Sequence, residues 1–389
     1  MSEIRVTNVL GENGNSSVNF TQGINMSGIV TATSFVPSQG QLSHRNKIIN
    51  GGMNVSQRQT SSTNSSVFVV DRFKAEVTQM DQLVQTLEQS SDSPDGFGKS
   101  IKITTTTPET SIASNEQFRI QTKLEGQDFQ DLEYGGSSAK TITISFYVKA
   151  SVTGTFGFTV FRSESTNRVI TAPYTISSAD TWERKIITIP GDTAGAAITN
   201  DNAERFRLMW GLAAGSDYTT ASASWGNYSS ANLLGGHVTN TLVTTDNATW
   251  QLTGVQLEVG PVATPFEHRS FADELQRCKR YYEQFDSNGL AEAPFGVGYF
   301  ESDTQLRAVV PLHEKRANIT FSSSAASTFA SMNTNNMPDG SAIGLYKTGK
   351  KAAIIVLTLG SSVSGGDGRA GILCAEGANE ATLKFDAEL

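Results

Sequence analysis

Apolar and polar residues alternate over much of the chain, which is the pattern of a β-strand with one buried and one solvated face. Residues 141–150 show this alternation most clearly. Their buried face would carry Ile142, Ile144, Phe146 and Val148. Further segments with a period of two lie at residues 118–124, 154–161, 206–212 and 250–259, and residues 182–189 could form another strand. Strands of this kind, separated by clusters of Gly, Asp, Asn and Ser, predict an antiparallel β-sandwich.

Two stretches depart from simple alternation. Within residues 250–259, the apolar positions are even before Gly254 and odd after it, so we expect a β-bulge at this glycine. The apolar spacing in residues 77–87 fits a helix, whereas its second half could equally be a strand that enters the turn at residues 91–96. We favour the strand.

One segment, residues 271–285, has the apolar spacing of an α-helix. Ser270 and Asp273 have the form of a capping box, and basic residues follow acidic ones as the helix dipole favours. Its apolar side could join a bundle around a symmetry axis, pack on a sheet edge, or cover the chain's own sandwich. The residues of a candidate trimer interface are Phe271, Leu275, Cys278, Tyr282 and Phe285.

Strand patterns resume after the turn-rich residues 286–289. They occur at residues 295–300, 306–312, 352–359 and 382–389. A second β unit is therefore expected over residues 286–389, either as a separate domain or as a completion of the sandwich.

Residues 1–45 have a different composition, because they are rich in Gly, Asn, Ser and Thr and contain few aromatic residues. Short alternating runs separated by glycines predict strands that cannot bury a core alone. Such strands obtain a core by associating with copies of themselves or by docking on a partner, and the alternative is a polar tail. The candidate docking residues are Ile4, Val6, Val18, Phe20, Ile29 and Phe35.

Composition narrows the function classes. The chain is 38% hydrophobic and 17% charged, against about 45–50% and 25% in ordinary domains, and the Ser, Thr and Gly that replace these residues disfavour a mostly helical enzyme. The net charge of −8 and the lack of a basic block argue against nucleic acid as a partner. We expect no signal peptide, no transmembrane segment and synthesis in the cytoplasm.

Catalytic and metal-binding motifs are missing from the sequence. The two cysteines are too few for a disulfide scaffold, and no zinc, calcium, nucleophile-elbow or phosphate-loop spacing occurs. The histidines His44, His237, His268 and His313 are scattered. We therefore expect no catalytic residues, no metal and no cofactor.

Aromatic residues in polar surroundings are the candidate binding groups. A flat ring beside short polar side chains suits the apolar face and the hydroxyl groups of a sugar. Trp182 could instead be a core or rim residue that opens a strand. The candidate glycan-binding residues are Trp182, Tyr218, Trp225 and Tyr228.

Several motifs resemble those of a known group of proteins. Residues 46–58 and 70–73, paired with residues 252–267 and 274–282, resemble the two ends of a β-sandwich domain in tail fibre proteins of tailed bacteriophages. Residues 1–36 resemble a recurrent segment in structural proteins of marine cyanobacterial phages. The domain between the motifs is similar to jelly-roll carbohydrate-binding modules.

The resemblance implies a homotrimeric, non-enzymatic fibre in the virion tail. Residues 1–45 would anchor it on a tail adaptor or nozzle protein, and the β domains would face a host polysaccharide or outer-membrane receptor. The expected fold is all-β, with an anchoring segment (1–45), a jelly-roll-like antiparallel sandwich (46–268), a short connecting helix (269–285) and a C-terminal β domain (286–389). The alternatives are a polysaccharide-degrading fibre and a purely structural decoration or adaptor protein.

Overall fold

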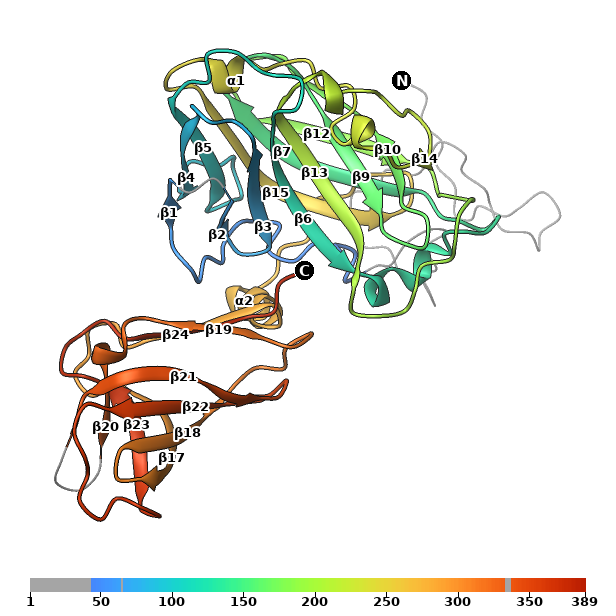
Figure 1. Cartoon of the computed structure of the whole chain (residues 1–389). Coiled ribbons are helices and arrows are strands. Elements are labelled where there is room, and N and C mark those ends of the chain that lie inside the picture. Colours follow the sequence, from blue (N-terminus) through green and yellow to red (C-terminus); the bar gives the residue numbers. More distant parts are fainter. Residues whose placement is uncertain (1–42, 64–65, 333–336) are drawn as a thin grey trace, which may run out of the picture. The chain divides into compact units, whose positions relative to one another are not determined.

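The computed structural model describes residues 43–63, 66–332 and 337–389 (Figure 1). Residues Gln39–Leu389 form one compact unit. The anchoring residues expected from the sequence, from Ile4 to Phe35, lie outside the described part of the chain.

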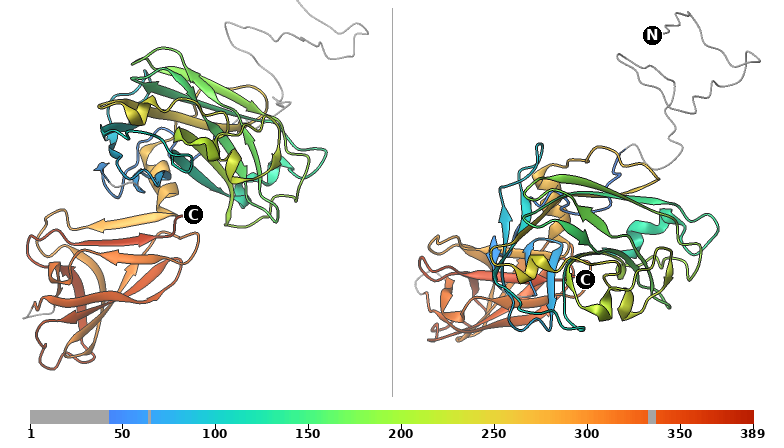
Figure 2. Two further views of the ribbon diagram at one scale, coloured as in Figure 1. Left: turned by 45° about the horizontal axis from the view of Figure 1, so that its top comes forward. Right: turned by 90° about the horizontal axis from the view of Figure 1, so that it is seen from above.

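Two antiparallel sheets build the sandwich of the N-terminal half (Figures 1 and 2). The first has the order β1 (Ser61–Ser62), β4 (Val84–Ser90), β5 (Ser100–Thr107), β15 (Thr249–Val259), β7 (Ile142–Ala150) and β12 (Glu183–Ile189). The second has the order β14 (Gly226–Asn227), β10 (Arg168–Thr171), β9 (Phe158–Arg162), β13 (Glu204–Ala214), β6 (Gln117–Glu125), β3 (Phe73–Thr78) and β2 (Phe68–Val70). Because the chain crosses repeatedly between the sheets, the expected all-β, jelly-roll-like fold is confirmed.

The inward residues of both sheets form one apolar core, as the period-two pattern predicted. Trp210 lies at its centre, with ring centroids 5.8 Å from Phe146 and 5.2 Å from Phe158. Residues 77–87 enter β3 and β4, which confirms strand rather than helix. Smaller elements complete this half: β8 (Gly154–Phe156), β11 (Tyr174–Ile176), α1 (Thr241–Thr244) and the 3₁₀ turns η1 (Gly126–Leu132), η2 (Ser216–Tyr218) and η3 (Ser230–Asn232).

The β-bulge expected at Gly254 is confirmed. The pairing of β15 with β7 shifts between Thr253 and Gln256, and Gly254 has a φ of 62°. A Cβ atom here would lie 2.8 Å from the Phe97 ring and 2.9 Å from the Tyr147 ring. Glycine is thus required both for the left-handed backbone and for the approach of the two rings.

Helix α2 (Phe271–Lys279) is shorter than the sequence suggested. Ser270 caps it by accepting a hydrogen bond from the Asp273 backbone at 3.2 Å, as expected. The expectation of a helix up to residue 285 is wrong, because Tyr282 and Phe285 lie in strand β16 (Tyr282–Asp286). That strand pairs with β24 (Thr382–Asp386), so a partner about a hundred residues away decides where the helix ends.

The C-terminal residues have their own apolar core. Strands β16, β24 and β19 (Thr320–Ser323) form a three-stranded sheet, with η4 (Ala326–Thr328) following. A six-stranded sheet has the order β20 (Phe329–Met332), β23 (Ala370–Ala375), β17 (Pro294–Ser302), β18 (Gln305–Pro311), β22 (Ala352–Leu359) and β21 (Gly340–Thr348). In the described residues, no helix has the length and apolar character needed to cross a membrane.

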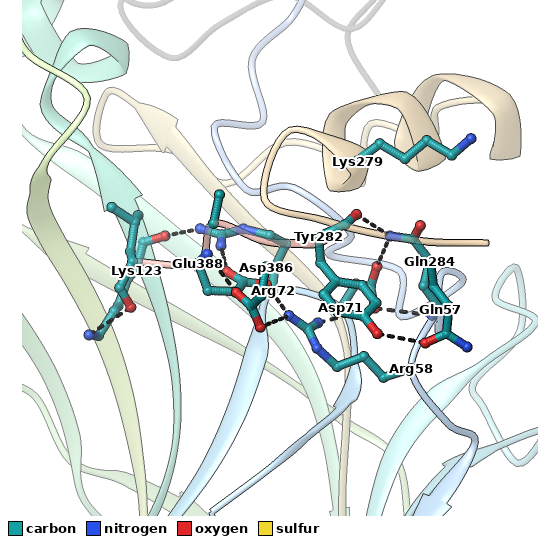
Figure 3. A network of polar contacts seen from close by, with 12 residues as sticks. Gln57, Arg58, Asp71, Arg72, Lys123, Lys279, Tyr282, Gln284, Asp386 and Glu388 are labelled. Carbon is teal, nitrogen blue, oxygen red and sulfur yellow. Dashed lines mark hydrogen bonds and ion pairs between the residues drawn. The ribbon is translucent and has the colours of Figure 1, made fainter. Parts of the chain in front are cut away.

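Two arginines of the sandwich, the buried Arg72 and the half-buried Arg58, contact the last residues of the chain (Figure 3). Arg72 forms an ion pair with Glu388, and its guanidinium carbon lies 3.4 Å from the centre of the Tyr281 ring. Arg58 contacts Asp386 at 3.1 Å and Glu388 at 3.3 Å. Guanidinium groups suit such sites because they pair with carboxylates and stack on aromatic rings at once.

Candidate functional site

The seven-stranded sheet turns a polar face away from the core. Along β6, Phe118, Ile120 and Leu124 point into the sandwich, so the alternate residues point outward. Strand pairing places the outward residues of the neighbouring strands beside them. We call this outward side of the sheet the polar face; it consists of Lys74, Glu76, Gln117, Arg119, Gln121, Lys123, Thr159, Phe161, Arg207 and Met209. Its half-buried members, which keep surface in contact with solvent, are Lys74, Glu76, Lys123 and Arg207, and the others are buried in the folded chain.

Hydrogen bonds link the side chains in the middle of the polar face. Arg119 donates to Gln121 Oε1 at 3.1 Å and pairs with Glu76 Oε2 at 3.0 Å. It also donates to Gln117 Oε1, and Gln121 donates to Glu76. The network holds each side chain in one orientation before any ligand arrives, which lowers the entropy lost on binding.

Arg119 is the most enclosed charge of the polar face, with 7% of its side chain exposed. Burial lowers the pKa of its guanidinium, and the Glu76 carboxylate opposes that shift. Arginine stays protonated throughout the ordinary pH range. The site therefore offers a fixed cation surrounded by amide groups.

Tyr218 and Tyr228 stand beside the polar face, in a small apolar cluster with Phe161 and Met209. The Tyr228 ring meets Phe161 edge-on at 5.1 Å between centroids. The Tyr218 hydroxyl donates to the Asn115 carbonyl at 3.2 Å. Both rings are half-buried, so each keeps surface that a ligand could contact.

A small cavity borders the polar face on the side of the chain's last residues. Its volume is about 10 Å³, room for about one water molecule. Lys123 pairs with Glu204 at 3.0 Å and donates to the Leu389 carbonyl at 2.9 Å. The lining residues are Phe68, Arg72, Lys74, Gln121, Lys123, Glu388 and Leu389.

The structure separates the four aromatic residues that the sequence grouped. Trp182 precedes β12 in the other sheet, where its Nε1 donates to Asp92 at 3.3 Å. Trp225 donates to the Pro190 carbonyl at 2.7 Å and packs edge-on against Tyr134. Only Tyr218 and Tyr228 adjoin the polar face.

Arg119 and its partners do not stand out in the sequence. Aromatic rings among polar residues do, whereas this site is built mainly from amide and charged groups. The available signal was the alternation from Gln117 to Lys123, in which every second residue is long and polar.

The candidate trimer residues divide between surface and interior. Cys278 is 1% exposed and Tyr282 is 3% exposed within the chain itself. Phe285 packs edge-on against Phe385, and Leu275 is half-buried. Phe271, at 59%, is the open member of the set.

The two halves of the motif at residues 46–58 and 252–282 meet in the structure. The Asn50 backbone donates to Glu274 Oε2 at 2.7 Å, although 224 residues separate them. Arg269 donates to the Ile48 carbonyl at 2.9 Å and contacts Glu274 at 3.1 Å. The Asn46 amide donates to the Val255 carbonyl at 3.2 Å. The quoted residues therefore form one buried polar junction that joins the start of the sandwich to its end.

Acidic, histidine and cysteine side chains do not gather into a metal site in the part of the chain that the structure describes. Cys278 and Cys374 are buried free thiols. Burial raises the pKa of the Cys278 thiol well above its usual range.

The fold is an antiparallel β-sandwich of the jelly-roll type, followed by a smaller β unit. No protein-family model matches the chain, and no curated protein sequence matches it. Among solved structures, the enzymatically active domain of bacteriophage CBA120 tailspike protein 4 is 10% identical with a TM-score of 0.30; the match covers 55% of this chain and 21% of that one.

Two other solved structures are similar over their whole length. A putative sugar-binding protein from Bacteroides thetaiotaomicron is 12% identical with a TM-score of 0.31, and the match covers 56% of this chain and 100% of that one. The family 11 carbohydrate-binding module of a Clostridium thermocellum cellulosomal cellulase is 11% identical with a TM-score of 0.27. This match covers 55% of this chain and 99% of that one.

Proposed function

We propose that this protein is a non-enzymatic, homotrimeric fibre of a bacteriophage tail, whose polar face binds a glycan on the host surface. The observation that carries the binding part is the hydrogen-bonded row of Glu76, Gln121, Arg119 and Gln117 beside Tyr218 and Tyr228. The fibre part is supported by the tail-fibre motif, whose two ends form one junction in the structure.

The chemistry of the polar face matches that of a sugar. Each sugar hydroxyl both donates and accepts a hydrogen bond. The half-buried Glu76 carboxylate offers an acceptor, and the half-buried Lys74 and Lys123 offer ammonium donors, while the buried row behind them holds Glu76 in place. A half-buried tyrosine ring supplies an apolar surface for the C–H groups of a pyranose. Because the polar side chains already hold one another, they need little rearrangement to bind.

Glycan binding is tested with the full chain on an array of purified bacterial capsular and lipopolysaccharide glycans. We expect binding to one glycan class, weakened roughly tenfold or more, about 1.4 kcal/mol, in Glu76→Gln and in Tyr228→Ala. Glu76 has 29% of its side chain exposed and Tyr228 is half-buried. Ile186→Ala is the matched control, because Ile186 is 53% exposed on the other sheet. Circular dichroism confirms that each variant is folded.

Two results would overturn this part of the proposal. The first is an array on which no glycan binds the wild-type chain, and the second is wild-type affinity in both variants. New reducing ends in the bound polysaccharide would instead identify a degrading enzyme.

The virion location is tested separately, by immunogold electron microscopy of phage particles with an antibody against the sandwich. Label on the tail is the expected result. Label on the capsid alone, or unlabelled particles, would contradict a tail fibre and leave the glycan measurement standing.

A further inference from the structure

The six-stranded sheet of the C-terminal part exposes an apolar face. Leu306, Ala308 and Val310 of β18 point into the core, so their neighbours in the strand point outward. Strand pairing aligns Val297, Val309 and Ile354 in one row across the sheet. The adjacent row holds Tyr299, Arg307 and Val356. We call this surface, completed by Tyr346 of β21, the outer face.

Large apolar side chains on the outer face are open to solvent. Val297 is 66% exposed, Tyr299 is 48%, and Val309 and Tyr346 are each 45%. An antiparallel sheet with one solvated face normally alternates apolar and polar residues. A contiguous exposed apolar patch marks an interaction surface.

The charge within the outer face is already compensated. Arg307 lies in the middle, and its guanidinium carbon is 3.7 Å from the centre of the Tyr346 ring. The same guanidinium forms an ion pair with Glu301. Lys347 lies at the edge strand, where it can stay in water. Burial of this face would therefore leave no unpaired charge, which is the main cost of burying an arginine.

We propose that copies of this chain associate through the outer face. Three identical faces can meet around a three-fold axis, because each is equally apolar and brings no uncompensated charge. The five strands from β23 to β21 span about 24 Å, and seven residues of strand span about 23 Å, which gives a flat area of about 550 Å². This approaches the roughly 800 Å² per partner of a stable interface, so we expect association at micromolar concentrations.

The inference does not depend on glycan binding. The inference takes its stoichiometry from the proposed homotrimer. It assigns the contact between subunits to the outer face instead of the α2 segment. Cys278 and Tyr282 of that segment are buried in their own chain, whereas the outer face is open.

The test is the mass of the full-length protein in solution, measured by sedimentation equilibrium up to about 100 µM. We expect the wild-type chain to form a multiple of 41.7 kDa. Val297→Lys and Val309→Lys should each weaken the association at least tenfold, because a lysine would be buried without a partner. Ile186→Lys places the same charge at an exposed apolar position of the sandwich and should leave the association unchanged.

Each outcome bears on a distinct claim. A wild-type chain of 41.7 kDa at every concentration would overturn both the outer-face contact and the homotrimer, with glycan binding unaffected. An oligomer that persists equally in Val297→Lys and Val309→Lys would overturn the outer face alone. Both valines are exposed, so we expect the two lysine variants to fold. Thermal unfolding of each variant checks this.

Discussion

Arg72 and Glu388 form an ion pair across 316 residues of sequence. Their side chains are 2% and 9% exposed, so the pair is shielded from water. Removal of one partner from such a pair leaves an uncompensated buried charge.

We therefore expect Glu388→Ala to lower the free energy of unfolding by about 3 kcal/mol. Urea denaturation measures the loss. Glu380→Ala is the matched control, because Glu380 is exposed, and it should change stability by less than about 0.5 kcal/mol. Equal midpoints for the two variants would show that Arg72 is solvated without its partner.

Asp71 makes stability depend on pH. Burial raises the pKa of its carboxyl to about 6 from 3.8, and Arg58 and Gln57 partly oppose the shift. A carboxyl with a raised pKa in the folded state contributes stability below its unfolded pKa and loses it as pH rises through the folded value.

Asp71→Asn removes this titration. The stability of the wild-type protein, relative to the variant, should fall by about 2–3 kcal/mol between pH 4 and pH 7. Urea denaturation at several pH values gives the difference. A difference that is flat over this range would mean that Asp71 is ionised throughout.

Gly254 should not tolerate a side chain. Gly254→Ala combines a positive φ with a Cβ atom less than 3 Å from two rings, so we expect a loss of roughly 2–4 kcal/mol. Gly98→Ala is the control, because a Cβ atom there meets nothing within 4 Å. Thermal unfolding compares the two, and similar melting temperatures would show that Phe97 moves away freely.

Trp225 should act in packing. Trp225→Phe removes the hydrogen bond to the Pro190 carbonyl and should cost about 1 kcal/mol of stability. The affinity of this variant for the glycan that the wild-type chain binds on the array should stay unchanged. A loss of binding at unchanged stability would assign Trp225 to the glycan site instead.

Local patterns predicted much of the fold. The strand at Ile142–Ala150 and the bulge at Gly254 follow from the order of neighbouring residues, so the sequence was sufficient for both. The end of α2 was not predictable in this way. Tyr282 and Phe285 continue a helical spacing, but in the structure they belong to a strand that pairs with β24.

The candidate site was only partly accessible from the sequence. Tyr218 and Tyr228 stood out as rings among polar residues. Arg119 is held by Glu76, which strand pairing brings beside it, and by Gln121, two residues along the same strand. Trp182 and Trp225 also lie among polar residues in the sequence, but the fold places them away from the polar face.

The pairing of β16 with β24 also determines when this sheet can form during synthesis of the chain. Residues 43–268 contain both sheets of the sandwich and are made first. Strand β16 follows soon afterwards but must wait about a hundred residues for its partner. Until then β16 has no strand beside it, and a neighbouring nascent chain could supply the missing strand. Polysome spacing would therefore influence how much protein matures correctly.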